Sequence, residues 1–423
     1  MIVVKYKYIS ALFFLLGLWL GAGLQSARSQ TLNEYLKEAA ENNLELKTKY
    51  QEYLSKMQKV PQVSALPDPV FSFGYFIMPV ETRLGPQQFK FSLQQKFPWF
   101  GTLKRQKDAA SKAALVSLQE VETLKNQLYF DVKQGYYQLT RLKNDISIVE
   151  QNLEVLTAYE ALVTNRYENG LAAMSDILRV QLQIREEENK LQKIKDDQVP
   201  IRSTFNHLLN REPDLPVVLP DSLMAALQEV NLVAFRDSML ASHPQLLQIE
   251  SAREALSSQL EVARIQNKPQ IGVGLDYVFL GKRTDMDPSG NGRDVLMPMV
   301  NMSVPIFNKK KYKAMEQEVK IQLESNELLY SRSSQKLLDA MEVAEAKYKD
   351  ARRRTKLYQQ QILQVQQMLD LLVNDYATSG KEFEEVLRTW QQKLGYQLNY
   401  SLAIADLWIA MAQLEFLAGN IEG

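Results

Sequence analysis

Two stretches of about one hundred residues contain no proline, and this limits the folds open to the chain. The first runs from Trp99 to Val199, and the second follows Pro305 to the C-terminus. Proline breaks helix interiors, so its absence permits helices far longer than the usual length of about a dozen residues. We expect a first long helix from about Leu103 to Asn165. Apolar residues recur in it mostly at intervals of three and four, the spacing of a packed helix seam: Leu118, Val121, Leu124, Leu128, Val132, Leu139, Leu142 and Ile146.

Two shorter segments alternate between apolar and other residues, which is the period of a strand. Phe71, Phe73 and Tyr75, for example, are separated by single small residues. The pattern predicts β-hairpins over about 69–98 and 269–305, each strand about ten residues long with one apolar face and one polar or small face. Strands that face lipid in a membrane barrel carry this pattern.

The N-terminus has the pattern of a secretory signal peptide. Two lysines precede an apolar run over 9–20, and the small residues Ala27 and Ser29 follow it. The run is shorter than the ~20 residues that a spanning helix needs, so we favour a cleaved signal over 1–29 rather than an uncleaved anchor. The mature chain should therefore work outside the cytoplasm.

Helices and hairpins occur twice in the same order. Residues from 232 onward align on those from 32 onward without a gap, so that Pro69 falls on Pro269, and further on Tyr167 aligns with Tyr376. Such self-similarity indicates an internal repeat. We divide the chain into the signal peptide, a first structural repeat over 30–220 with long helices at about 103–199, and a second over 221–423 with long helices at about 308–418.

Composition excludes several classes of protein. Lys plus Arg and Asp plus Glu both number 50, so the formal charge is +0 and nucleic acid binding is not expected. The chain has no cysteine and only two histidines, which excludes disulfides and cysteine metal sites. It carries no phosphate loop, nucleophile elbow or HExxH motif, so we expect neither an enzyme nor a cofactor.

The number of expected strands is too small for a closed structure. Four strands cannot enclose a lumen, and backbone groups that face lipid must all be paired. If the strands lie in a membrane, several chains must therefore share one barrel.

The duplicated order, together with RYENGLAAMSDIL and YATSGKEFEEVL at the two helix reversals, resembles the TolC family of outer-membrane efflux proteins. The resemblance implies a mainly α fold with a small β part, and a homotrimer whose strands form a 12-stranded outer-membrane β-barrel above a periplasmic α-helical tunnel. It also implies a passive exit duct that receives solute from a periplasmic adaptor and an inner-membrane pump. LPDPVFSFGY and QKFPWFG are most similar to members paired with resistance-nodulation-division pumps.

The two reversals are the candidate functional site, the channel gate at the periplasmic tip. Gly170 and Gly380 are natural turn residues, and Tyr167 and Tyr376 each stand nine residues before an acid. In a trimer Asp176 and Glu385 would place six carboxylates around the mouth, a ring that attracts cations.

The resemblance adds a basic residue to this site. In the family the second turn carries a tyrosine, a base and acids that hold the closed end together, and Tyr376, Lys381 and Glu385 match them. Arg388 stands where a second acid is often found. We hypothesise that Lys381 pairs with Asp176 in the closed state. The alternative is that these are solvated charges at helix ends.

Two further alternatives stay open. A periplasmic coiled-coil structural or adaptor protein would place the hairpins in a small soluble β-domain instead of the outer membrane and its lipid. The methionines of the second hairpin, Met297, Met299 and Met302, suit membrane-facing packing better than a soft-metal site.

Overall fold

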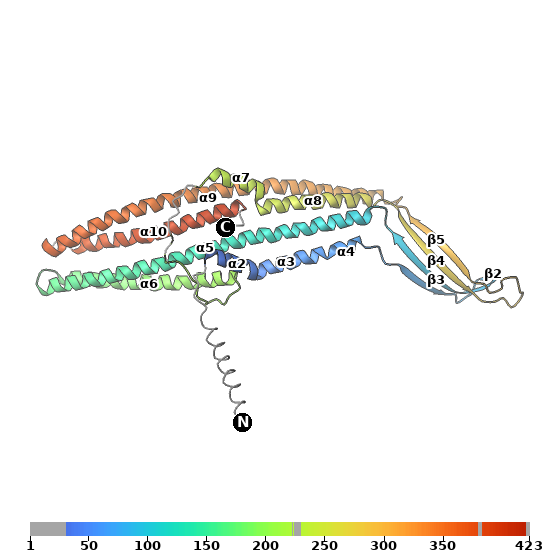
Figure 1. Ribbon diagram of the computed structural model, residues 1–423, viewed down its shortest axis with the longest axis horizontal. Coiled ribbons are helices and arrows are strands. Elements are labelled where there is room, and N and C mark those ends of the chain that lie inside the picture. The colour runs from blue at the N-terminus through green and yellow to red at the C-terminus, as the bar shows by residue number, and fades with distance from the viewer. Residues whose placement is uncertain (1–30, 222, 224–229, 380–382, 420–423) are drawn as a thin grey trace, which may run out of the picture.

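The computed structural model describes residues 31–221, 223, 230–379 and 383–419, so the expected signal peptide over 1–29 lies outside the described residues. The expectation of a mainly α chain with a small β part is confirmed (Figure 1). The first half contains α2 (Leu32–Asn42), α3 (Leu44–Met57), α4 (Lys59–Ser64), β1 (Val70–Tyr75), β2 (Glu81–Thr82), β3 (Gly85–Phe97), α5 (Thr102–Glu168) and α6 (Met174–Leu208). The second half contains α7 (Leu232–Ser242), α8 (Pro244–Ile265), β4 (Gln270–Leu280), β5 (Val295–Ser303), α9 (Lys309–Ser379) and α10 (Phe383–Leu417).

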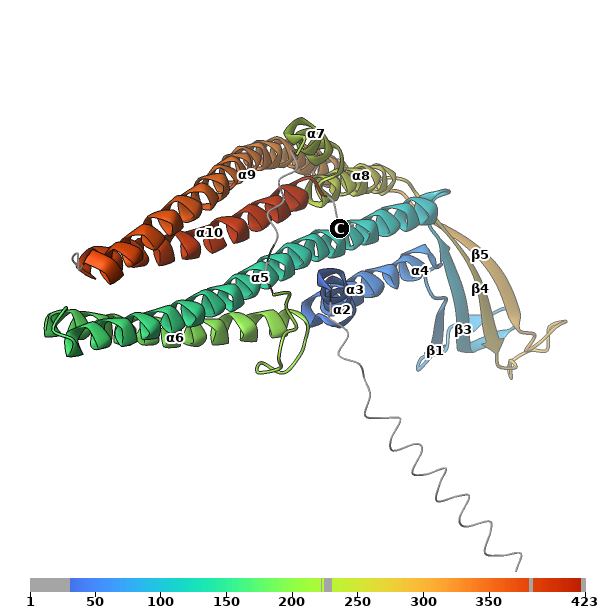
Figure 2. The ribbon, with the colours of Figure 1, turned by 60° about the vertical axis from the view of Figure 1, so that its left-hand side comes forward.

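The helices form an elongated body with the sheet at one end and, at the other, the α5–α6 turn, the C-terminal end of α9 and the start of α10 (Figures 1 and 2). The 67 residues of α5 and the 71 of α9 correspond to about 100 Å of helix each at 1.5 Å per residue. Antiparallel partners pack against both, α6 against α5 and α10 against α9. The long proline-free segments therefore set the length of the molecule.

The return helix α6 extends beyond the expected end near residue 199. It contains Pro200 and continues to Leu208. A proline inside a helix removes one hydrogen bond and strains the preceding turn. The residues after it are nevertheless held by packing, because Phe205 and Leu209 are buried in the central core beside Tyr35. Tertiary burial overrides the local signal here.

Helix α10 is the only described helix that is long and apolar enough to cross a membrane by length and composition. Half of its most apolar window is buried inside the molecule, where it packs between α9 and α5. Its apolar character is explained by this packing, as expected for the core helix of a bundle.

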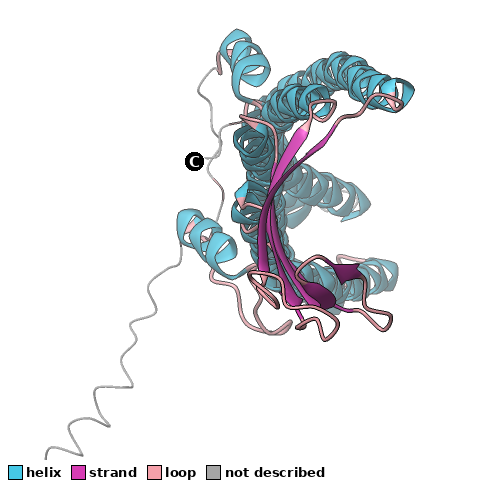
Figure 3. Cartoon of the chain, turned by 90° about the vertical axis from the view of Figure 1, so that its right-hand side faces the viewer, coloured by secondary structure: helices cyan, strands magenta, loops and turns pink. Residues whose placement is uncertain are grey.

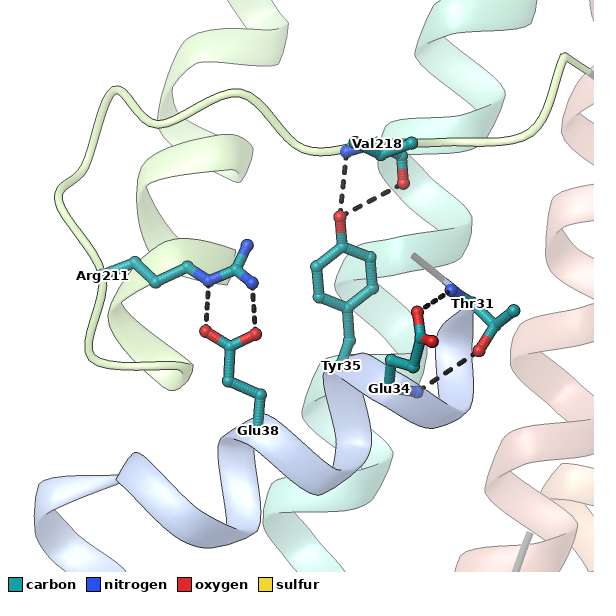
Figure 4. Close-up of polar contacts among 6 residues, drawn as sticks. All are labelled: Thr31, Glu34, Tyr35, Glu38, Arg211 and Val218. Atoms are coloured by element: carbon teal, nitrogen blue, oxygen red, sulfur yellow. Dashed lines mark hydrogen bonds and ion pairs between the residues drawn. The ribbon is translucent and has the colours of Figure 1, made fainter. Parts of the chain in front are cut away.

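A polar cluster holds α2, the first described helix, against the segment that follows α6 (Figure 4). Thr31 and Glu34 form a capping box at the start of α2. Further along, Glu38 makes a bidentate ion pair with Arg211, whose guanidinium lies 5.1 Å from the ring centroid of Tyr35. The hydroxyl of Tyr35 accepts a hydrogen bond of 2.9 Å from the backbone N–H of Val218. The segment after α6 is thereby tied to α2.

Equivalent short helices cover the ends of both return helices. α2 and α7 each have 11 residues and are followed by Asn43 and His243, which cap the next helix with their side chains. Asn43 also donates from Nδ2 to the carbonyl of Leu208 at the end of α6 (2.9 Å), and the ring of His243 packs edge-on against Phe416 near the end of α10. The two halves of the chain thus repeat this joint with different chemistry.

Four antiparallel strands form one sheet in the order β1-β3-β4-β5, and the short β2 pairs with β3. The two hairpins are joined through β3 and β4, where Phe91 lies opposite Tyr277 and Ser92 opposite Asp276. No described helix packs against a face of this sheet, and within the described chain β1 and β5 have no partner on their outer edges. The sheet is therefore a single open layer (Figure 3).

The faces of the sheet differ in chemistry and in exposure. One face carries aromatic and aliphatic side chains that are largely exposed, such as Phe71 at 65% and Val300 at 78%. The other carries mainly small, polar and charged residues together with a few aliphatic ones, and along β4 its residues Asp276 and Val278 are buried. Side chains on one face of a single-layered sheet become buried when the sheet curves so that this face is concave. The polar face is accordingly concave and the apolar face convex.

This arrangement corrects the prediction for two methionines. Met302 lies on the apolar face, opposite Ile271, as expected. Met297 and Met299 lie opposite Asp276 and Gly274 and so belong to the polar face. The side-chain period of a strand is two, which places them on the face of Asn301 and not on that of Met302.

Candidate functional site

The end of the molecule farthest from the sheet contains the α5–α6 turn, the C-terminal end of α9 and the start of α10. Gly170 lies in the turn between α5 and α6 with φ of 71°, in the left-handed region that favours glycine. Its N–H donates to the carbonyl of Tyr167, and the N–H of Leu171 donates to the carbonyl of Arg166, which closes the helix end. Gly380 of the second reversal lies outside the described residues.

The two tyrosines of the reversals differ in their surroundings. Tyr167 is 45% exposed, whereas Tyr376 is only 2% exposed. The ring of Tyr376 packs against Phe383, with 5.0 Å between the centroids. Burial raises the pKa of the Tyr376 hydroxyl, and the negative charge of Asp176 raises it further. Tyr376 is therefore a neutral packing residue at the tip, and Tyr167 is a surface residue.

Arg166 joins the two halves of the chain at this level. Its guanidinium lies 4.8 Å from the ring centroid of Tyr376 and donates from Nη1 to the backbone carbonyl of Ala377 at 2.7 Å. It thus crosslinks the last turn of α5 to the last turns of α9. Sequence reasoning did not select Arg166, because a basic residue in the last turn of a helix is common.

The acidic residues of the tip have arginine partners within the same chain. Asp176 lies 3.6 Å from Nη1 of Arg179, and Nη2 of the same arginine lies 3.1 Å from Glu384 on α10. Glu385 lies 3.5 Å from Arg388. The expected partner of Asp176, Lys381, lies outside the described residues. Arg179 and Glu384 were missed by the sequence analysis, because surface charges on helices carry little local signal.

An apolar cluster of all four long helices supports the tip. Trp390 is completely buried in it, and Phe383 contacts both Tyr376 and Tyr159. The buried members of this tip cluster are Val149, Leu156, Val163, Ile177, Val180, Leu369, Tyr376, Phe383, Val386, Leu387, Trp390 and Leu394. The polar contacts of Arg166 and Arg179 therefore rest on a packed base.

The described residues contain no group of three or more His, Cys, Asp and Glu side chains that could hold a metal ion. Of the two histidines, His243 is buried at the start of α8, and burial lowers its pKa to about 4. The chemistry available at the tip is thus ion pairing, cation–π contact and apolar packing.

Comparisons with known proteins identify the family of this architecture. The family model for outer membrane efflux proteins matches residues 82–211 and 236–420. The chain is 24% identical over 326 residues to the toxin and drug export protein A of Aggregatibacter actinomycetemcomitans, across 75% of this chain and 68% of the relative. It is 22% identical over 190 residues to the pyoverdine export outer membrane protein OpmQ of Pseudomonas putida, across 44% of this chain and only 40% of that relative.

Solved structures share the fold. The outer-membrane channel OprN superposes with a TM-score of 0.76 at 15% identity, covering 92% of this chain and 89% of that one. CusC gives 0.75 at 15% identity, with 93% and 95% covered. VceC from Vibrio cholerae gives 0.71 at 15% identity, with 92% and 96% covered. From the match of the family model over most of its length, the chain belongs to the outer membrane efflux protein family.

Proposed function

We propose that three copies of this chain form a passive exit duct that crosses the outer membrane and extends into the periplasm. In this proposal the sheets of three protomers close a 12-stranded barrel, and their long helices form the tunnel below it. An inner-membrane pump and a periplasmic adaptor deliver the solute, and no residue of the duct performs a chemical reaction. Relatives named for the export of toxins and drugs and for the export of pyoverdine support an export role of this kind.

One observation carries the proposal: the four-stranded sheet is convex and apolar outside, concave and polar inside, and open at both edges. An exposed apolar face suits lipid, and a concave polar face suits a water-filled lumen. The free edges of β1 and β5 leave backbone groups without partners in the described chain. In a bilayer such groups must be paired, and neighbouring copies can supply the partners.

The tip is the proposed gate of this duct. Arg166 links α5 to α9, and Arg179 links α6 to Glu384 on α10, so that the helices of the two halves are held together at the end farthest from the sheet. Parting these contacts would widen the mouth without breaking the packed base around Trp390. The proposed gate therefore includes Asp176, Tyr376 and Glu385, together with Gly380 and Lys381 of the adjoining turn.

The test separates a duct from a periplasmic adaptor. The full-length chain, expressed in a Gram-negative host, should stay in the membrane after washing with carbonate at high pH and should need detergent for extraction. It should then migrate as a heat-modifiable trimer and conduct ions in planar bilayers. Release by alkali as a monomer would rule out the duct and favour the adaptor.

A further inference from the structure

A fully buried carboxylate lies in the single-layered sheet. Asp276, on the polar face of β4, is 0% exposed. It accepts a hydrogen bond of 2.6 Å from the Oγ of Ser92, which lies directly opposite on β3. The other oxygen of Asp276 forms an ion pair with Nζ of Lys90, which precedes Ser92 by two residues on β3. The charged head of Lys90 is thus drawn across the sheet towards β4.

Small residues on β4 shape the floor beside this pair. A Cβ at Gly272 would lie 2.0 Å from the Oδ1 of Asn301, and one at Gly274 would lie 3.1 Å from the Cγ of Gln94. Side chains from both neighbouring strands therefore fold over β4 on its concave face. Asp276 lies on the same face and is fully buried although no second layer of the described chain covers the sheet, so the carboxylate has no direct access to solvent.

The charges on this face are unequal in number. Lys90 and Lys96 of β3 share it with Asp276 of β4, as the strand register shows. A buried charge needs a charged or hydrogen-bonding partner, because desolvation makes an isolated carboxylate costly. Lys90 and Ser92 supply these partners. Lys96 is exposed on the same face and can serve as the reference lysine when the reactivity of Lys90 is measured.

We propose that the Lys90–Asp276 pair is a selectivity element of the pore, in which the buried carboxylate neutralises a lysine that would otherwise face the lumen. The proposal rests on the proposed function, because it needs the concave face to line a water-filled path. In a trimer the pair occurs three times around the barrel. Charged rings inside a pore decide which ions pass, so removing Asp276 leaves the positive charge of Lys90 without compensation.

Ion selectivity tests the element directly. In planar bilayers under a KCl gradient, Asp276→Asn leaves Lys90 unpaired and should lower the ratio of K⁺ to Cl⁻ permeability about threefold at low salt, where screening is weak. Lys90→Met leaves Asp276 buried with Ser92 alone, where desolvation favours the protonated carboxyl, so the ratio should stay close to the wild-type value. The double variant should return to the wild-type ratio.

Lysine labelling tests the same pair without conduction. We expect acylation of Lys90 in the detergent-solubilised wild type to be severalfold slower than that of Lys96, and Asp276→Asn to remove the difference. The labelling experiment remains informative if Lys90→Met fails to fold, since it uses Asp276→Asn, which keeps the shape of the buried side chain.

The outcomes separate the two proposals. A wild-type trimer that conducts, with an unchanged permeability ratio for Asp276→Asn, would overturn the selectivity element and leave the duct intact. Equal labelling of Lys90 and Lys96 in the wild type would also overturn it. A wild-type protein that fails to conduct would overturn the duct, whatever the labelling shows.

Discussion

The return helices α6 and α10 have the same length and equivalent places in the chain, yet they differ in burial. Each has 35 residues and follows the reversal of a longer helix. α10 packs against α9 and α5 and buries Trp390 and Leu407 completely. α6 packs mainly against α5 and leaves Leu178 and Leu182 exposed. Repetition of a sequence pattern thus does not repeat its environment, because only one copy can occupy the interior.

This difference has a consequence for assembly. An inner helix is stabilised within its own chain, whereas an outer helix presents apolar side chains that a neighbouring copy can cover. The proposed trimer supplies such a neighbour for α6. The comparison can be tested by paired substitutions on and around the two helices.

The largest effect is expected at the tip cluster. Trp390→Ala should lower the free energy of unfolding by about 3–5 kcal/mol, because it removes a large, fully buried side chain from α10. The aligned residue on α6 is Gln181, which donates to Glu160 at 2.8 Å on a partly exposed surface. Gln181→Ala should cost less than about 1 kcal/mol. Both are measured by denaturant unfolding of the purified protein followed by helical circular dichroism, and equal losses would contradict the inner-and-outer assignment.

Acid should loosen the joint at the end of α10 more than that at the end of α6. The pKa of His243 falls to about 4 in the folded chain, below its usual value of about 6.5, so the unfolded chain binds the proton more readily. The contribution of neutral His243 to the free energy of unfolding is present above about pH 6.5 and is lost as pH falls towards 4. The loss amounts to about 3 kcal/mol at roughly 1.4 kcal/mol per pKa unit.

The matched control for this joint is provided by the first half of the chain. Asn43 occupies the equivalent cap and does not titrate in this range. His243→Asn should keep the cap, since the Asn side chain caps α3 in the same way, and should flatten the dependence of stability on pH between 6.5 and 4. An unchanged slope would show that other groups account for the acid sensitivity.

The two arginine contacts of the tip should differ in strength. Arg166→Ala removes a mostly buried guanidinium from the ring of Tyr376 and the carbonyl of Ala377, at a cost of about 1–3 kcal/mol. Arg179→Ala removes exposed ion pairs, for which less than about 1 kcal/mol is expected. Single-channel conductance should therefore rise more for Arg166→Ala. A larger rise in conductance for Arg179→Ala would indicate that the contact between α6 and α10 controls opening, and not the contact of Arg166.

The smallest effect is expected on the exposed side of α6. Leu182→Ser should change the stability of the folded protomer by no more than about 0.5 kcal/mol, because the side chain is already exposed. The comparison on α10 is Leu394→Ser, which places a hydroxyl in the buried tip cluster and should cost several times more. If Leu182→Ser instead weakens the trimer on native gels, α6 faces a neighbouring copy.

Much of the fold could be predicted because it depends on the spacing of apolar residues and on the positions of proline. Alternation around Phe71 and Phe73 located strands, and the long proline-free runs located α5 and α9. The same rule of alternation would have placed Met297 and Met299 on the polar face, had the parity of Asn301 been applied to them. The extension of α6 through Pro200 could not be predicted, since it depends on the packing of Phe205 against Tyr35.

The candidate tip could be predicted only in part. The repeated motif predicted Tyr376 and Asp176 as tip residues, because both belong to a local pattern. Arg166 was missed, since its contact with Ala377 joins residues 211 positions apart. The Lys90–Asp276 pair was missed for the same reason. It depends on how the two hairpins pair along β3 and β4, and no local spacing specifies that register.

The amino-acid sequence by itself determined the kinds of element, the great length of α5 and α9 and the repeated order, because helix and strand periods and the absence of proline act locally. Only the tertiary structure decided which copy of each element is inside. It also decided which charges meet and which face of the sheet is concave. These outcomes depend on contacts between the two halves of the chain, where burial and pairing are settled by all the neighbours of a side chain at once.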